Sequence, residues 1–186
     1  MQLTFRQIPP YTLQDANLIA NWFNQEDLRK TMSTWVRSRT HTSDSIAITL
    51  EESDPIFEHL FMIEVQEQNQ DHPIIIGHAG IDGIDTLDKR AELFYCIGDS
   101  LYRGKGLSYQ ITNYLSHYAF NTLNLNSLIA GVVQGNDASM KPLIKNGFIQ
   151  TGIYPEYNCI DGIYHDELLF SLTKKQYLTN SAIQQK

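Results

Sequence analysis

The stretch "YRGKGLSYQITNYL" (residues 102–115) places two glycines and two cations immediately before a segment with helical periodicity. A helix N-terminus carries backbone N–H groups without partners inside the helix, and the helix dipole adds partial positive charge there. Gly104 and Gly106 let a ligand approach the backbone closely, while Arg103 and Lys105 add two full charges. We therefore predict an anion-binding loop, and phosphate is the usual ligand of such loops.

Three phosphate-binding patterns compete for this loop. The P-loop pattern G-x-x-x-x-G-K-[ST] is absent, because Gly104 and Gly106 enclose a single residue. The dinucleotide fingerprint G-x-G-x-x-G/A fails at Tyr109, and no acidic residue follows about 20 residues later. The third pattern, R/Q-x-x-G-x-G/A, is typical of coenzyme A pyrophosphate loops. Arg103 and Gly106 match it, and Ser108 stands where Gly or Ala is usual. A glycine-rich turn that binds nothing stays open as the alternative.

The segments around the loop predict an α/β fold. Alternating and β-rich runs predict strands at residues 3–8, 59–66, 74–85, 90–98, 126–135, 148–154 and 164–172, the last two joined by a hairpin turn at Asp161–Gly162. Helical spacing and capping residues predict helices at residues 13–32, 43–53, 107–124 and 136–147. The length favours a single domain over residues 1–176, followed by a C-terminal tail at 177–186 whose last residues, "NSAIQQK" (180–186), are expected to fray.

Composition and charge narrow the range of partners. The 186 residues carry a net charge of −7, which argues against nucleic-acid binding and is compatible with a cationic partner such as an amine. The two cysteines form no disulfide framework and fall in strands, where buried free thiols are common. No apolar signal core or membrane span is present, so we expect a cytoplasmic protein. The six histidines lack metal-ligand spacing, which predicts no metal site.

A second motif, "NDASMKPLIKNGF" (136–148), follows the loop between two strands. Together with "AELFYCIGDSLYRGKGLS" (91–108), it resembles the GNAT superfamily of acetyl-CoA-dependent N-acetyltransferases, over about residues 3–173. The N-x-x-S form and the tail "YNCIDGIYHDELLFSL" (157–172) are most similar to the RimJ/RimL-like branch. The resemblance implies a mixed central sheet of about seven strands, flanked by about four helices and splayed between "LFYCIG" and "LIAGVV" to hold acetyl-CoA.

The resemblance also assigns residues to acetyl-CoA, the expected cosubstrate. The backbone N–H groups near Ile97 and Gly98 would face the acetyl carbonyl, and Asn136 would contact the pantetheine amides. The pyrophosphate would be held by the loop residues Arg103, Gly104, Lys105, Gly106, Leu107 and Ser108. A long, amide-bearing arm is well held by an unpaired strand edge, which offers N–H and C=O groups at regular spacing.

Acetyl transfer to an amine requires a proton acceptor and a proton donor. Many members of the superfamily use a tyrosine as the donor, but Leu143 stands at the matching position, and the RimL-type branch implies Ser139 instead. The candidates for the proton acceptor are Glu92 and Glu156. The RimL-type branch has a glutamate near Glu156, but an ungapped count from Ser139 places that glutamate on Asn158, two residues away. Ser139 as an ordinary first-turn helix residue, and both carboxylates as surface groups, stay open as alternatives. Inside this helix Pro142 predicts either a late start, near Ser139, or a bend.

The sequence therefore predicts an N-acetyltransferase that moves the acetyl group of acetyl-CoA to a primary amine. The acceptor would be a protein N-terminus or a small amine such as a polyamine, an aminoglycoside or an amino-sugar. We expect neither a nucleic acid nor a membrane as partner, and a homodimer is compatible with the sequence. The alternative is a non-catalytic acyl-CoA-binding regulatory module of the same fold.

Overall fold

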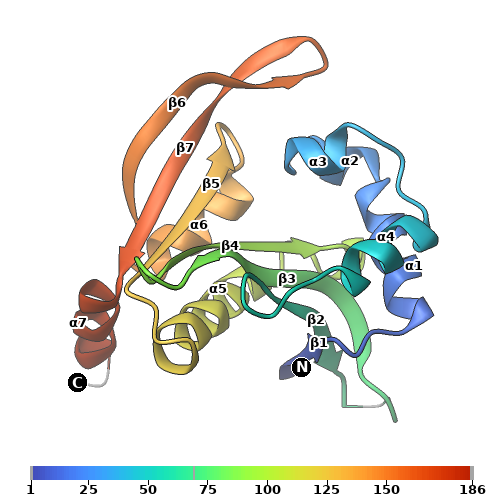
Figure 1. Ribbon diagram of the computed structural model, residues 1–186, viewed down its shortest axis with the longest axis horizontal. Coiled ribbons are helices and arrows are strands. Elements are labelled where there is room, and N and C mark those ends of the chain that lie inside the picture. Colours follow the sequence, from blue (N-terminus) through green and yellow to red (C-terminus); the bar gives the residue numbers. More distant parts are fainter. Residues whose placement is uncertain (1, 69, 185–186) are drawn as a thin grey trace. The chain divides into compact units, whose positions relative to one another are not determined.

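The computed structural model describes residues 2–68 and 70–184 and contains a seven-stranded mixed sheet (Figure 1). The strand order is β1-β2-β3-β4-β5-β7-β6, with β4 parallel to β5 and β7 antiparallel to it. The strands are β1 (Gln2–Ile8), β2 (His59–Gln66), β3 (Ile74–Asp85), β4 (Arg90–Ile97), β5 (Ser127–Val133), β6 (Ile149–Ile160) and β7 (Ile163–Thr173). The predicted α/β class, with a mixed sheet of seven strands, is confirmed.

Two compact units divide the chain. The first comprises Met1–Gly80 and Phe94–Lys105, and the second comprises Ile81–Leu93 and Gly106–Lys186. Strands β3 and β4 each contribute residues to both units, and the 102–108 loop passes from the first unit into the second. The predicted single domain over residues 1–176 stays a prediction.

Helices of the first unit depart from the sequence prediction between residues 13 and 32. Instead of one helix, this stretch and the residues after it form three short helices, and the predicted helix at 43–53 is confirmed as α4. The bounds are α1 (Leu13–Phe23), α2 (Glu26–Arg29), α3 (Thr34–Arg37) and α4 (Ser43–Glu51). The break follows from Asn24, whose Nδ2 donates to the carbonyl oxygen of His41 at 2.7 Å and whose Oδ1 accepts from the backbone N of His41 at 2.9 Å. This side chain fastens the end of α1 to the segment before α4.

Capping boxes start two of these helices. Thr12 and Asp15 cap α1, and Thr42 and Ser45 cap α4, each by reciprocal side-chain and backbone hydrogen bonds. Asp15 is fully buried and also forms an ion pair with Arg6 of β1 at 2.6 Å. The start of α1 is thus tied to the sheet, and the apolar side chains of α1 and α4 pack with those of β1 and β2 in one core cluster.

In the second unit three helices accompany the strands. Helix α5 (Leu107–His117) continues into a π-helical turn, η2 (Tyr118–Thr122), and α6 (Asp137–Lys145) packs against α5. These helices agree with the predicted spans. The expectation of fraying from residue 180 is wrong as far as Gln184, because helix α7 spans Lys174–Gln184. The boundary between domain and tail at residue 177 stays a prediction. Its first turn is held by Thr173 and Gln176, whose side chains bond each other's backbone N–H groups.

The described residues therefore contain seven α-helices rather than about four, because the 13–32 helix breaks and α7 forms. β6 and β7 form the long hairpin drawn in orange in Figure 1. Its turn at Asp161 and Gly162 has φ values of 51° and 81°, as a two-residue type I′ turn requires. Cys96 is buried, as expected, but Cys159 on this hairpin is exposed, contrary to the expectation for strand cysteines.

Candidate functional site

The 102–108 loop has the backbone geometry that an anion-binding loop needs. Gly104 and Gly106 have φ values of 73° and 77°, a left-handed conformation that other L-residues adopt with strain. A Cβ built on either glycine would find no atom within 4 Å. The two glycines are therefore required by the backbone, and the space around them is open.

Helix α5 begins directly after this turn. Gly106 is its N-cap residue, and no side chain within the described parts of the chain makes a capping hydrogen bond to it. Leu107 is buried and anchors the first turn, while Ser108 is half-buried. The first-turn N–H groups of α5 are thus uncapped by side chains, so their partial positive charge is available to an anion.

Arg103 is engaged by protein acceptors of the first unit. Its Nε donates to the carbonyl oxygen of Ile97 at 2.8 Å and its Nη2 donates to that of Gly98 at 2.7 Å. The guanidinium also bonds to Asp27 and to the side-chain oxygen of Gln25. These contacts use four of its five N–H donors. Its predicted role on the pyrophosphate stays a prediction, and the contacts give it the second role of holding the end of β4.

Lys105, the other cation of the loop, lies over an aromatic ring. Its Nζ is 4.7 Å from the ring centroid of Tyr102, within the range of a cation–π contact. Tyr102 is buried, and its hydroxyl donates to Glu67 at 2.8 Å, a bond that raises the pKa of the phenol. Because Lys105 is exposed, its ammonium stays accessible from the solvent.

The end of β4 is closely packed. Ile97 and Gly98 are buried, and a Cβ on Gly98 would come within 2.0 Å of the indole of Trp22. Glycine is therefore required at residue 98 by the approach of α1. On β3, Gly77 has the same function, since a Cβ there would lie 2.2 Å from the carbonyl oxygen of Cys96.

The ladder between β4 and β5 is short. It pairs Arg90 with Ser127, Ala91 with Leu128, and Glu92 with Ile129. β5 itself is paired with β7 along its whole length, from residue 127 to residue 133. Glu92 is therefore the last residue of β4 within this ladder.

Glu92 lies beside the backbone of β5. Its Oε1 accepts a long hydrogen bond of 3.4 Å from the backbone N of Gly131. Although the side chain is exposed, surrounding protein atoms desolvate the carboxylate and raise its pKa, and the negative charges of Asp82 and Glu167 raise it further. Glu92 is thus the predicted site residue with the most perturbed carboxylate.

Ser139 occupies the first turn of α6. The side-chain oxygen of Asn136 caps this turn by accepting from the backbone N of Ser139 at 3.3 Å. Ser139 is half-buried, and no hydrogen bond of its hydroxyl is found among the described residues. The helix begins at Asp137 and continues through Pro142, so the predicted late start is wrong. Leu143, where a tyrosine is usual, is a core residue, 2% exposed.

Glu156 lies in an irregular part of the hairpin. The β6–β7 register shifts between Tyr154 and Asn158, and Glu156 adopts a φ of 52° there. Its backbone N donates to Asp166 at 2.9 Å, and its side chain is exposed. Nothing in the described part of the second unit connects Glu156 by hydrogen bond or ion pair to Ser139.

Sequence reasoning missed Glu167, which approaches the same backbone as Glu92. The side chain of Asn158, only 5% exposed, donates from Nδ2 to Glu167 Oε2 at 2.8 Å. In the sequence, Glu167 reads as an ordinary strand residue of "YHDELLFSL". Its relation to Asn158 depends on the hairpin bulge, which leaves no local sequence signal.

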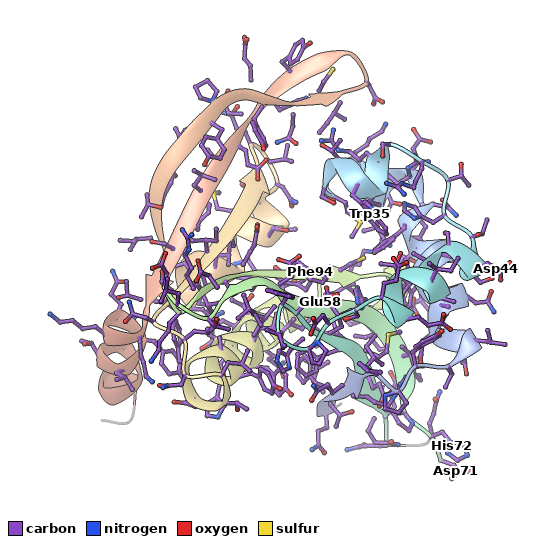
Figure 2. All side chains as sticks on the ribbon, in the orientation of Figure 1. Trp35, Asp44, Glu58, Asp71, His72 and Phe94 are labelled. Atoms are coloured by element: carbon purple, nitrogen blue, oxygen red, sulfur yellow. The ribbon has the colours of Figure 1, made fainter. Side chains whose placement is uncertain are left out.

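Aromatic rings form a continuous cluster in the first unit. Phe23 contacts Trp35, His41 and His78, and His78 contacts Phe94 at 5.4 Å between ring centroids. Figure 2 labels Trp35 on α3 and Phe94 on β4, the two ends of this cluster. Trp35 is 38% exposed, whereas His78 is buried with neither ring nitrogen hydrogen-bonded. Burial lowers the pKa of His78 to about 4, so its imidazole is neutral at pH 7.

No group of three or more His, Cys, Asp or Glu side chains in residues 2–68 and 70–184 is arranged to hold a metal ion. In the same residues, no helix has both the length and the apolar character of a membrane span.

The chain is similar in sequence to known N-acetyltransferases. Residues 3–149 match the family model of the acetyltransferase (GNAT) domain. The uncharacterized N-acetyltransferase p20 of Bacillus licheniformis is 29% identical over 177 residues, which is 95% of each chain. The putative ribosomal N-acetyltransferase YdaF of Bacillus subtilis is 27% identical over 103 residues, 55% of this chain and 56% of that protein.

A solved structure extends the likeness. Spermidine N-acetyltransferase from Vibrio cholerae, in complex with CoA and spermine, has a TM-score of 0.82 at 23% identity, covering 95% of this chain and 98% of that chain. This likeness shows the fold that the two chains share.

Proposed function

Because the chain belongs to the acetyltransferase (GNAT) domain family, we propose that it transfers the acetyl group of acetyl-CoA to the primary amine of a small cationic acceptor. The protein is an acyltransferase with acetyl-CoA as cosubstrate. The narrower assignment to the RimJ/RimL-like branch, the cytoplasmic location and the homodimer stay predictions.

The observation that carries this proposal is the carboxylate of Glu92. Glu92 is the last residue of β4 that pairs with β5. Desolvation and the negative charges of Asp82 and Glu167 raise the pKa of its carboxylate. A carboxylate whose pKa is raised toward neutrality is a better proton acceptor than an ordinary surface glutamate. The acidic groups of Asp82, Glu92 and Glu167 interact with one another and also favour a positively charged amine as acceptor, as does the net charge of −7.

Residues of the loop fit the cosubstrate. Acetyl-CoA supplies the acetyl group as a thioester. The open turn at Gly104 and Gly106 and the uncapped N–H groups of α5 suit its phosphates, with Lys105 as an accessible cation. The backbone N–H groups near Ile97 and Gly98 would receive the acetyl carbonyl oxygen, and Asn136 would bind the pantetheine arm through its amide NH₂.

Two side chains would move protons. Glu92 takes a proton from the acceptor ammonium, which leaves a neutral amine able to attack. Ser139 donates its hydroxyl proton to the sulfur as the thiol leaves and recovers a proton from the amine nitrogen or from water. The geometry supports this role, because Asn136 rather than the Ser139 hydroxyl caps α6.

A protein N-terminus is the second candidate acceptor. The similarity to the ribosomal N-acetyltransferase YdaF favours it, whereas the fold shared with the Vibrio cholerae spermidine N-acetyltransferase favours a polyamine. Both acceptors present a primary amine that is protonated at neutral pH, so Glu92 would have the same task with either.

The test is thiol release from acetyl-CoA with a panel of acceptors at equal concentration: spermidine, an aminoglycoside, an amino-sugar and short peptides with free N-termini. We expect the highest kcat/KM with spermidine and a product heavier by one acetyl group. A peptide preferred over every small amine would instead establish the protein N-terminus as the acceptor.

A further inference from the structure

We propose that Glu167 is a positioning residue for Glu92: held by Asn158 against the backbone of Gly131, it places a fixed negative charge beside the peptide unit that binds the Glu92 carboxylate. The inference rests on the proposed function of Glu92 as proton acceptor. It adds a residue of β7 to a site that the sequence assigns to β4, α6 and the 102–108 loop.

Glu167 is anchored by the side chain of Asn158. Asn158 is 95% buried and donates from Nδ2 to Glu167 Oε2 at 2.8 Å. In the β6–β7 register, Glu167 lies opposite Tyr154, and Asn158 lies opposite His165. The register shift between Tyr154 and Asn158 thus separates the anchor from the strand position of its partner. This hydrogen bond from a buried amide restrains the Glu167 carboxylate, because breaking it would cost the free energy of a hydrogen bond to a charged group.

The second step is the convergence of two carboxylates on Gly131. A Cβ built on Gly131 would lie 2.1 Å from Oε1 of Glu167, so this carboxylate occupies the space that any side chain would need. The backbone N of the same glycine donates to Oε1 of Glu92 at 3.4 Å. The absence of a side chain at residue 131 therefore lets both carboxylates approach one peptide unit from β4 and β7.

The third step is the charge balance at Glu92. From β3, Asp82 faces it; from β7, Glu167; and from β5, the N–H of Gly131. The two carboxylates and desolvation disfavour the ionised form of Glu92, and the N–H favours it, with a net rise of its pKa. The buried amide of Asn158 holds the Glu167 carboxylate in place, so Glu167 contributes a fixed charge.

The negative charge of Glu167 raises the pKa of Glu92, which affects how readily Glu92 accepts a proton in the reaction. While Glu167 is ionised, Glu92 binds a proton more readily, which helps it to take one from the acceptor ammonium. Neutralising Glu167 would lower the pKa of Glu92, so the acid limb of the pH profile would move to lower pH and the plateau rate would fall. A residue with a purely structural role would change stability without moving that limb.

The experiment compares wild type with Glu167→Gln, which keeps the shape and an acceptor oxygen for Asn158. Carbon-13 NMR of the side-chain carboxyls follows the titration of Glu92 directly, and kcat/KM for spermidine is measured across the acid range. We expect the Glu92 pKa and the acid limb of the kcat/KM profile to fall together, because the variant loses a nearby like charge. The plateau should fall roughly threefold, following Brønsted behaviour.

Two further variants keep the result interpretable. Asp88→Asn removes the same charge from an exposed turn of the second unit and should leave the Glu92 titration unchanged. Asn158→Ala keeps the charge of Glu167 but removes its anchor, so the Glu92 pKa should fall by a smaller amount. If Glu167→Gln fails to fold, Asn158→Ala carries the test.

The proposal is overturned if the Glu92 titration is the same in Glu167→Gln as in wild type, even if the variant loses activity. Failure of the proposed function has a different signature. If Glu92→Gln acetylates spermidine at the wild-type rate, Glu92 is not the proton acceptor, and the positioning role for this reaction falls with it. The NMR titration still reports the coupling between the two carboxylates in that case.

Discussion

Arg103 donates a hydrogen bond from its guanidinium to the carbonyl oxygen of Gly98 at 2.7 Å. This contact connects the loop that the sequence assigns to phosphate with the end of β4, where the resemblance places the acetyl group. With further bonds to the carbonyl oxygen of Ile97 and to the side chains of Gln25 and Asp27, the guanidinium of Arg103 holds these parts of the first unit together.

The variant Arg103→Lys tests whether Arg103 stabilises the first unit or binds the phosphates of CoA. Lysine retains the positive charge but cannot reproduce four hydrogen bonds in the geometry of the fork. We expect the free energy of unfolding to fall by about 2 kcal/mol, the loss typical of hydrogen bonds to a charged group. The CoA dissociation constant should change little when measured by calorimetry well below the melting temperature. A large loss of CoA affinity at wild-type stability would show that the guanidinium binds the cosubstrate instead.

Gly106→Val tests the turn itself. Valine at a φ of 77° strains the backbone and places a side chain in open space where the phosphates are expected. We expect CoA binding to be lost in calorimetric titration while circular dichroism retains the native spectrum. Gly83→Val is the matched control, because Gly83 also has a positive φ, 58°, and open space around its Cβ. Equal CoA affinity in the two variants would move the ligand away from this turn.

Ser139→Ala distinguishes a proton donor from a helix residue. The cap of α6 is the side chain of Asn136, so removing the Ser139 hydroxyl should leave the melting temperature nearly unchanged. If the hydroxyl protonates the leaving thiol, kcat should fall by roughly 10²- to 10⁴-fold with unaltered CoA affinity. Asn136→Ala should show a loss of stability of about 1 kcal/mol. A Ser139→Ala enzyme with wild-type kcat would exclude the hydroxyl from the reaction.

Because His78 is buried and neutral, we expect the free energy of unfolding to fall at acidic pH. Burial lowers its pKa to about 4, whereas the unfolded chain should have an ordinary value near 6.5. Between these two pH values the unfolded state binds more protons than the folded state, so stability falls as the pH falls. At pH 5 the loss should be about 2 kcal/mol relative to neutral pH. Urea unfolding of wild type and His78→Leu at pH 7 and pH 5 measures it, because other groups cancel in the difference; an equal loss in both proteins would contradict the assignment.

Features with local causes could be predicted from the sequence. The glycines at residues 104 and 106, the cap at Asn136 and the turn at Asp161 each depend on a few neighbouring residues, and the structure has them as expected. Six of the seven strand spans were predicted to within two residues, since β-rich runs bounded by turn residues are a strong signal. The exception is β6, which continues to Ile160, six residues beyond the predicted end. The Thr173 and Gln176 capping box carried a readable signal for α7 that a prediction of fraying overlooked.

Features that depend on contacts between distant parts of the chain could not be predicted from the sequence. Arg103 reads as a phosphate ligand until Gln25 and Asp27, more than 70 residues away in sequence, take its donors. The helix predicted over residues 13–32 breaks because Asn24 bonds to His41, a contact between segments whose packing no periodicity reveals. Glu167 approaches Gly131 because β5 pairs with β7, with Gly131 opposite Leu169 and Val133 opposite Glu167. Glu156, predicted from the motif, lies exposed where the β6–β7 register shifts.

The most direct test of the account is the effect of Glu92→Gln on acetylation of spermidine, measured as thiol release and confirmed by the mass of the product. Glutamine has the shape of glutamate but cannot take a proton from the acceptor ammonium. The account predicts a fall in kcat/KM of roughly 10²- to 10⁴-fold, with CoA affinity and melting temperature close to wild type. A variant that acetylates spermidine within threefold of the wild-type rate, at the same pH, would contradict the central claim that Glu92 is the proton acceptor of this acetyltransferase.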